Sequence, residues 1–110
     1  MAQAYETMYI IRPDLGEEQI EQVIGQYQAI LENNGATKLQ IQHRGKRRFA
    51  YPIHKLREGI YIQMNYYGNG SCIAAMEKAM RLSDQVIRFM TITVEVEEAE
   101  LEVEAEPVAV

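Results

Sequence analysis

Four stretches of the chain predict β-strands, either because polar and apolar residues alternate or because aromatic and β-branched residues are frequent. The stretches cover residues 5–12, 37–51, 60–67 and 86–96. The first is rich in aromatic and β-branched residues and is apolar on both faces, which indicates a central strand. The two faces of the last are too alike to assign. One face of the third is expected to lie against helices, and it carries Ile60, Ile62, Met64 and Tyr66.

Two glycines change what these patterns predict. Gly45 interrupts the alternation of the second strand, where a bulge or bend is the usual meaning. A bulge shifts the alternation, so the pattern leaves open which of Lys46, Arg47 and Arg48 share a face. Residues 52–59 are expected to form the loop that joins the second strand to the third. Gly25 falls inside a helical stretch, and we expect it to allow a close approach to the sheet.

Apolar residues at spacings of three and four predict two helices. The first begins at Glu17 and Glu18, where negative charge is favourable, and ends near Asn34 and Gly35. Its apolar stripe consists of Ile20, Val23, Ile24, Tyr27, Ile30 and Leu31. The second follows the turn and capping residues at 68–71. Its apolar positions are Ile73, Met76, Ala79 and Met80.

The predicted order of elements is β-α-β-β-α-β. Two right-handed crossovers place both helices on one face of a four-stranded antiparallel sheet, an α+β architecture of the ferredoxin-like class. The other face of the sheet then stays uncovered. Many unrelated proteins use this architecture, so the fold class alone does not identify a function.

The formal net charge of −5 is an average over two unlike parts. Residues 1–94 hold eleven basic and nine acidic residues and are mildly positive, whereas residues 95–110 hold seven Glu and no base. We therefore expect one folded domain over residues 1–96 and an acidic, disordered tail over residues 97–110. The negative total does not argue against a nucleic-acid partner.

Composition narrows the class of protein further. A chain of 110 residues is long enough for one hydrophobic core. The single Cys72 cannot form an internal disulfide, and no apolar run approaches the roughly 20 residues of a membrane span. The first residues lack a signal-peptide pattern. These features predict a cytoplasmic protein with no membrane partner.

The densest chemical signal is a basic run over residues 43–52. Four cations occur within five positions, namely Arg44, Lys46, Arg47 and Arg48. Two aromatic residues, Phe49 and Tyr51, follow them, and residues 38–57 contain seven bases and no acid. Ordinary protein surfaces mix the two signs of charge, and this run does not. It is the pattern of a surface that binds an anion such as RNA.

No catalytic constellation accompanies this run. His43 and His54 lack a cysteine or carboxylate at ligand spacing, and Cys72 has no flanking signature of a reactive thiol. No glycine-rich phosphate loop precedes a helix. We therefore expect no enzymatic activity, no cofactor, no metal and no small-molecule substrate.

Binding of RNA remains, and two modes are open. RNA readers of this topology stack bases on aromatic residues of the central strands, and Tyr61 stands in such a position. The residues around it match the RNA-recognition signature poorly, because that signature starts with Lys or Arg and contains several Phe. Backbone contacts from the hairpin between the second and third strands fit better. Further cations that extend the candidate surface are Arg12, Arg81 and Arg88.

Two other classes share this architecture. One is a regulatory module that binds a small molecule or a protein in a defined pocket. The other is a small hydrolase resembling the acylphosphatases, which needs an Arg and a phosphate loop after the first strand. Arg12 stands in roughly that place, but residues 12–15 supply no glycine-rich cradle.

Several stretches resemble bacterial small-subunit ribosomal protein S6. They are Tyr5-Glu6-Thr7 with Arg12-Pro13-Asp14-Leu15, Gly45-Lys46-Arg47-Arg48-Phe49-Ala50-Tyr51-Pro52-Ile53, Glu58-Gly59, and Val86-Ile87-Arg88-Phe89-Met90. The second is the signature stretch of that family, and Phe49 departs from it where Leu is usual. The resemblance extends over residues 5–96.

The resemblance implies a structural, non-catalytic component of the small ribosomal subunit. It implies binding to the central domain of the 16S ribosomal RNA together with a basic partner, ribosomal protein S18, as a heterodimer. The expected RNA contacts are Arg44, Lys46, Arg47, Arg48 and Tyr51, with Arg12, Arg81 and Arg88 as further candidates.

Overall fold

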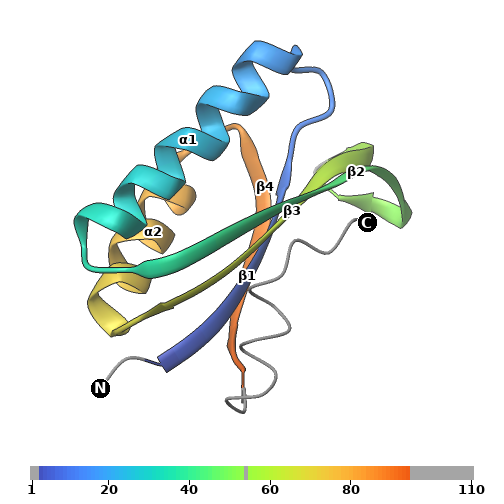
Figure 1. Cartoon of the computed structure of the whole chain (residues 1–110). Coiled ribbons are helices and arrows are strands. Elements are labelled where there is room, and N and C mark those ends of the chain that lie inside the picture. The colour runs from blue at the N-terminus through green and yellow to red at the C-terminus, as the bar shows by residue number, and fades with distance from the viewer. Residues whose placement is uncertain (1–2, 54, 95–110) are drawn as a thin grey trace.

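Four strands and two helices follow one another in the predicted order β-α-β-β-α-β (Figure 1). The computed structural model describes residues 3–53 and 55–94. The elements are β1 (Gln3–Ile11), α1 (Glu17–Asn33), β2 (Thr37–Ile53), β3 (Leu56–Gly68), α2 (Gly70–Leu82) and β4 (Val86–Thr93). The predicted tail at residues 97–110 lies outside the described residues. No helix of the described part is long and apolar enough to cross a membrane.

The strands form one antiparallel sheet in the order β2-β3-β1-β4. Strands β1 and β3 are central, as the two-sided apolar pattern of β1 predicts. Both helices lie on one side of the sheet, and the far end of the β2–β3 hairpin projects beyond them (Figure 1). This confirms the ferredoxin-like fold class. We call the two sides of the sheet the covered face and the open face.

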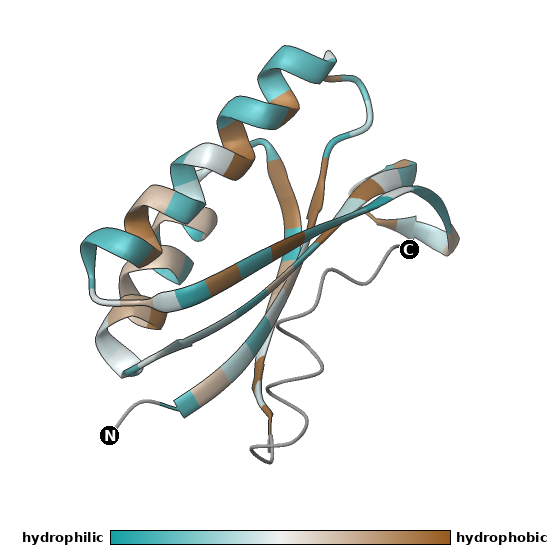
Figure 2. Cartoon of the chain, viewed as in Figure 1, coloured by the Kyte–Doolittle hydropathy of each residue, from teal (hydrophilic) through white to brown (hydrophobic). Residues whose placement is uncertain are grey.

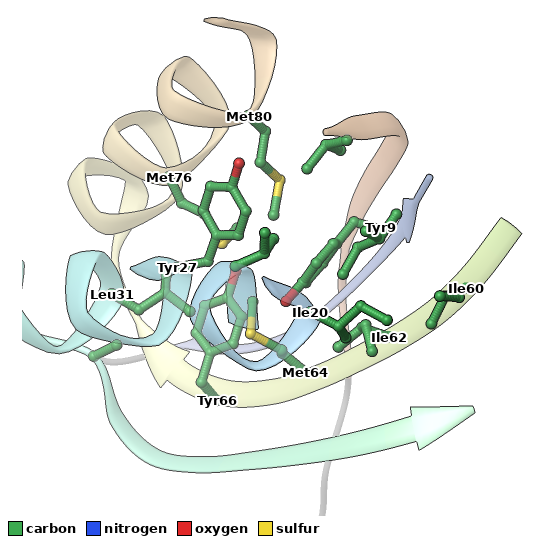
Figure 3. Packing of buried hydrophobic residues seen from close by; sticks show 14 of the residues in the cluster. Tyr9, Ile20, Tyr27, Leu31, Ile60, Ile62, Met64, Tyr66, Met76 and Met80 are labelled. Atoms are coloured by element: carbon green, nitrogen blue, oxygen red, sulfur yellow. The ribbon is translucent and has the colours of Figure 1, made fainter. Parts of the chain in front are cut away.

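The core fills the space between the covered face and the helices (Figure 3). Its largest fully buried side chains include Tyr9, Tyr27, Tyr66, Met64 and Met80. The Tyr9 and Tyr27 rings meet edge to face, with centroids 5.5 Å apart. The hydroxyl of Thr7, which is buried on β1, lies 2.7 Å from the Tyr66 hydroxyl and 2.8 Å from that of Thr91. Three hydroxyl groups of this face therefore bond to one another, whereas the buried hydroxyl of Tyr9 has no hydrogen-bond partner within the described part of the chain.

Both helices have the ends that their sequences predict. The side chain of Gln19 accepts a hydrogen bond from the backbone N–H of Gly16 at 3.2 Å, just before α1 begins. Gly35, which follows α1, has a φ of +97°, a conformation that glycine adopts without strain. Asn69 precedes α2, and its side-chain oxygen accepts the backbone N–H of Ser71 at 3.0 Å.

Three expectations from the sequence are wrong in detail. The hairpin loop does not span residues 52–59, because β2 continues to Ile53 and β3 already begins at Leu56. Strand β4 ends at Thr93 rather than at residue 96. Gly25 is exposed, and a Cβ atom built on it would meet nothing within 4 Å. That glycine therefore allows no close approach of α1 to the sheet.

Candidate nucleic-acid interface

The bulge at Gly45 decides which cations of β2 share a face. His43 pairs with Ile62 and Gly45 with Tyr61, so Arg44 is the extra residue of β2. Gly45 has a φ of +87°, which favours glycine over other residues at the bulge. Before it, even-numbered residues face the open side, where Gln42 stands opposite Gln63.

After the bulge, odd-numbered residues take the open face. Gly45 stands opposite Tyr61 and Arg47 opposite Gly59. Lys46 and Arg48 alternate with them and lie on the same side of the hairpin as Ile60, whose side chain joins the core. The basic run is therefore divided between the two sides of the hairpin. We call Arg44, Lys46, Arg47 and Arg48 together the hairpin patch.

An aromatic cluster supports the hairpin patch on the open face. The guanidinium carbon of Arg47 lies 5.9 Å from the centroid of the Tyr61 ring. The Phe49 ring lies 6.3 Å from the same ring, at a tilt of 59°. An arginine over an aromatic face gains a cation–π attraction and keeps its outward donors. Phe49, Tyr61 and Arg47 thus form one layer on the open face.

Arg44 is held by a side-chain amide of the neighbouring strand. Its Nε and Nη2 atoms both donate to Oε1 of Gln63, at 3.1 and 2.7 Å. Nε2 of Gln63 in turn donates to Glu6 at 3.3 Å and to Asn65 at 2.9 Å. The network crosses the open face from β2 over β3 to β1. It gives this cation a fixed position.

The cations of the hairpin patch differ in ion pairing from two of the other candidates. Arg12 pairs with Asp14 at 3.2 Å, and Arg81 pairs with Glu77 at 3.7 Å. Within residues 3–53 and 55–94, no salt bridge joins a carboxylate to a cation of the hairpin patch. No carboxylate of the described part thus lies within ion-pair distance of the patch, although Glu58 stands opposite Arg48 in the sheet.

The remaining candidates lie in three places. Arg88 of β4 is exposed on the open face, across from Ile10, which also pairs with Tyr61. Arg81 lies at the end of α2, with its guanidinium 5.8 Å from the Phe89 ring. Arg12 follows β1 and its backbone N–H donates to Gln85. The structure thus brings Arg88 onto the face that carries Arg44 and Arg47, places Arg12 in a hollow that Leu56 of the hairpin also lines, and leaves Arg81 on α2.

Tyr51 lies near the end of the hairpin and is 67% exposed. It lines a surface hollow together with Arg48, Phe49, Ala50, Pro52 and Arg57. An exposed ring beside two guanidinium groups suits contact with a nucleotide. Arg57 was not among the sequence-based candidates, although it belongs to the same acid-free stretch.

Sequence reasoning missed how Tyr61 and Gln63 serve the hairpin patch. The Tyr61 ring lies under the guanidinium of Arg47, and Gln63 accepts two hydrogen bonds from Arg44. Neither role is visible along the chain, because both depend on the register of β2 against β3. The signal that existed was Gly45, which marks the bulge without giving its partner residue.

Beyond Arg88, the open face of β4 carries two exposed apolar side chains. Met90 is 63% exposed and Ile92 is 46% exposed. Met90 stands opposite Met8 of β1, and Ile92 stands opposite Glu6. We call Met90 and Ile92 the apolar strip. Figure 2 shows the mixture of hydrophilic and hydrophobic residues along β2 and the hydrophobic segments of β4.

The described residues provide no metal centre. Among them, no group of three or more His, Cys, Asp or Glu side chains is placed to hold an ion. His54 lies outside the described residues. Cys72 is fully buried at the start of α2, as expected for a small packing residue.

Comparison with known proteins gives one consistent result. The family model "Ribosomal protein S6" matches residues 4–93. A small ribosomal subunit protein bS6 from Cyanothece sp. is 64% identical over 92 residues, which cover 84% of this chain and 87% of the relative. The bS6 protein of Thermosynechococcus vestitus is 63% identical over 98 residues, covering 89% and 85%.

A solved structure agrees with these sequences. The crystal structure of 30S ribosomal protein S6 from Thermotoga maritima superposes with a TM-score of 0.80 at 28% identity, covering 96% of this chain and 95% of that one. A hydroxynitrile lyase from Passiflora edulis, at 12% identity and a TM-score of 0.51, shares the fold alone. With the basic hairpin patch and the ferredoxin-like sheet in place, the chain belongs to the ribosomal protein S6 family, a family of structural proteins and not of enzymes.

Proposed function

We propose that this protein is a structural component of the small ribosomal subunit in the cytoplasm. It binds the central domain of 16S ribosomal RNA through the β2–β3 hairpin, together with ribosomal protein S18 as a heterodimer. Family membership supports the ribosomal role. The observation that carries the RNA contact is the hairpin patch, whose four cations have no ion pair within the described chain.

The proposed mechanism is charge neutralisation combined with shape matching. Cations that meet RNA phosphates release condensed counterions, which favours binding and makes it sensitive to salt. Arg44 and Arg47 lie on one side of the hairpin, whereas Lys46 and Arg48 lie on the other. A projecting hairpin with cations on both sides fits between two RNA strands or helices. Such contacts fix the register of the protein on the RNA without reading its sequence.

The apolar strip is the part of the open face proposed to bind the partner protein. Met90 and Ile92 are large, exposed apolar side chains on an edge strand. Contact with a protein removes such surface from water, whereas contact with phosphates does not. On this proposal the partner protein covers Met90 and Ile92, whereas RNA meets the hairpin patch on the other edge of the sheet. The acidic segment at residues 95–106 is proposed as a further contact with this basic partner, because RNA would repel its charge. These residues lie outside the described part of the chain.

The rival functions fit the structure less well. A small hydrolase would need Arg12 free to bind a phosphate, but its guanidinium pairs with Asp14. A regulatory module would leave the unpaired cations of the hairpin patch without a role. Membership of the ribosomal protein S6 family favours the ribosomal proposal over both.

The test is binding to a fragment of the small-subunit RNA, with and without ribosomal protein S18, over a series of salt concentrations. The variant Arg47→Ala/Arg48→Ala is compared with the wild type. We expect binding to need the partner, and the variant to lose affinity with a log–log salt slope shallower by about 1–2. Lys78→Ala is the control, because Lys78 is an exposed cation on α2.

Three outcomes separate the possibilities. An unchanged slope and affinity for the double variant would show that the hairpin patch contacts no RNA. An equal loss for Lys78→Ala would show that only total charge matters. Absence of binding even with the partner would leave the fold standing and remove the RNA-binding role.

A further inference from the structure

Gln63 is a polar side chain in an unusual place. It lies in the centre of β3, on the open face, and only 9% of it is exposed. A buried amide is costly unless its oxygen and nitrogen both find hydrogen-bond partners. Gln63 finds four such contacts, with the side chains of Arg44, Glu6 and Asn65. The surroundings of residue 63 thus provide both donors and acceptors for a side-chain amide.

The partners of Gln63 define which way its amide points. Guanidinium N–H groups only donate, so Oε1 has to face Arg44. The carboxylate of Glu6 and the side-chain oxygen of Asn65 accept, so Nε2 has to face them. The reversed amide would set donor against donor and acceptor against acceptor. The oxygen that binds Arg44 therefore has a fixed direction.

This bond uses only one edge of the Arg44 guanidinium. Nε and one hydrogen of Nη2 bind Gln63. The second hydrogen of Nη2 and one hydrogen of Nη1 remain free of this bond, and together they form the end edge of the planar fork. That edge matches two oxygens of a phosphate. Holding the first edge removes freedom that the long side chain would otherwise lose on binding RNA.

We propose that Gln63 is a positioning residue for RNA binding, which holds Arg44 so that its free edge meets an RNA phosphate. The proposal rests on the RNA-binding function proposed above and deepens it. Gln63 touches no RNA itself. It acts through Arg44, and its effect must vanish when Arg44 is absent.

The test is a double-mutant cycle with Gln63→Met, Arg44→Ala and the combination, measured with the small-subunit RNA fragment and ribosomal protein S18. Methionine keeps the length of the side chain and removes both hydrogen-bonding groups. We expect Arg44→Ala to lower the salt slope by about 1. Gln63→Met should weaken binding about fivefold with an unchanged slope, because the cation remains but is no longer held. In the Arg44→Ala background, Gln63→Met should change nothing further.

A second variant keeps the test decisive if Gln63→Met folds poorly. Gln63→Glu retains the acceptor that faces Arg44, loses the donor that faces Glu6, and places a carboxylate against the guanidinium. We expect this variant to lose affinity with a slope shallower by about 1, because the cation is held but neutralised. Thermal unfolding of every variant separates loss of fold from loss of binding.

Two results would overturn the positioning role. An equal effect of Gln63→Met with and without Arg44 would make Gln63 a general support of the sheet. An Arg44→Ala variant with wild-type affinity and slope would show that Arg44 meets no phosphate. The second result leaves the proposed function to be judged by Arg47→Ala/Arg48→Ala alone, so the two proposals fail separately.

Discussion

The covered and open faces of the sheet are built from the same strands and have different tasks. Along β3, Ile62 and Met64 point into the core, whereas Tyr61 and Gln63 organise the arginines of the open face. Neighbouring residues therefore act in different ways because a strand alternates its side chains. Substitutions on the covered face should change stability, and those on the open face should change binding.

The largest expected contrast comes from one chemical change made on each face. Met64 is fully buried, whereas Met90 is 63% exposed. We expect Met64→Ala to lower the free energy of unfolding by about 2–5 kcal/mol, because it leaves a cavity in the core. Met90→Ala should change it by less than about 0.5 kcal/mol. Denaturant unfolding of both variants measures this, and similar losses would refute the division of the sheet.

Gly59 is a place where the open face should affect stability. A Cβ atom there would collide with the Ile10 side chain and lie 3.0 Å from the Phe49 ring. We expect Gly59→Ala to cost about 1–3 kcal/mol of unfolding free energy through overpacking. Gly25→Ala is the matched control and should stabilise by about 0.5–1 kcal/mol, since α1 has room for the methyl group. A neutral Gly59→Ala would mean that Ile10 moves aside freely.

The apolar strip should affect the partner and not the fold. We expect Met90→Gln/Ile92→Gln to weaken binding of ribosomal protein S18 about tenfold, because polar amides replace apolar contact. The free energy of unfolding should stay close to that of the wild type, since both side chains are exposed. Calorimetric titration with the isolated partner gives the affinity. An unchanged affinity would remove the apolar strip from the interface.

The buried tyrosines of the covered face should make the stability of the protein depend on pH in alkaline solution. Burial raises the pKa of Tyr9 and of Tyr66 above the ordinary value of 10.0. Above pH 10 the unfolded chain loses these protons while the folded chain keeps them, so stability is present below pH 10 and falls as the pH rises. We expect Tyr9→Phe to flatten that fall. Thermal unfolding between pH 8 and about 11 follows the fall, and a Tyr9→Phe variant with the same pH profile as the wild type would contradict this prediction.

The sequence was sufficient to predict structure where it depends only on residues nearby in the chain. The alternation along β3 placed Ile60, Ile62, Met64 and Tyr66 on the covered face, and the structure buries all four. Gly35 marked the end of α1 for the same reason, because few other residues adopt its φ of +97°. Resemblance of the signature stretch to the ribosomal protein S6 family was confirmed by the family model.

The sequence was insufficient where the position of a residue depends on how its strand pairs with a neighbouring strand. Pro52 was expected to end β2, yet β2 is an edge strand, where a residue without an N–H is tolerated. The support of Arg47 by Tyr61 and of Arg44 by Gln63 follows from pairing that no single segment encodes. The RNA contacts themselves stay predictions, because they concern a partner molecule.

The extra residue of β2 also has a genetic consequence. Insertion of one codon directly after that for Gly45 would shift the rest of β2 by one residue against β3, so every side chain beyond that point would change sides. Arg47 would leave Tyr61, and Lys46 and Arg48 would move to the open face. No point substitution exchanges so many contacts at once. The exact number of residues in β2 therefore determines the binding surface as much as the identity of its arginines does.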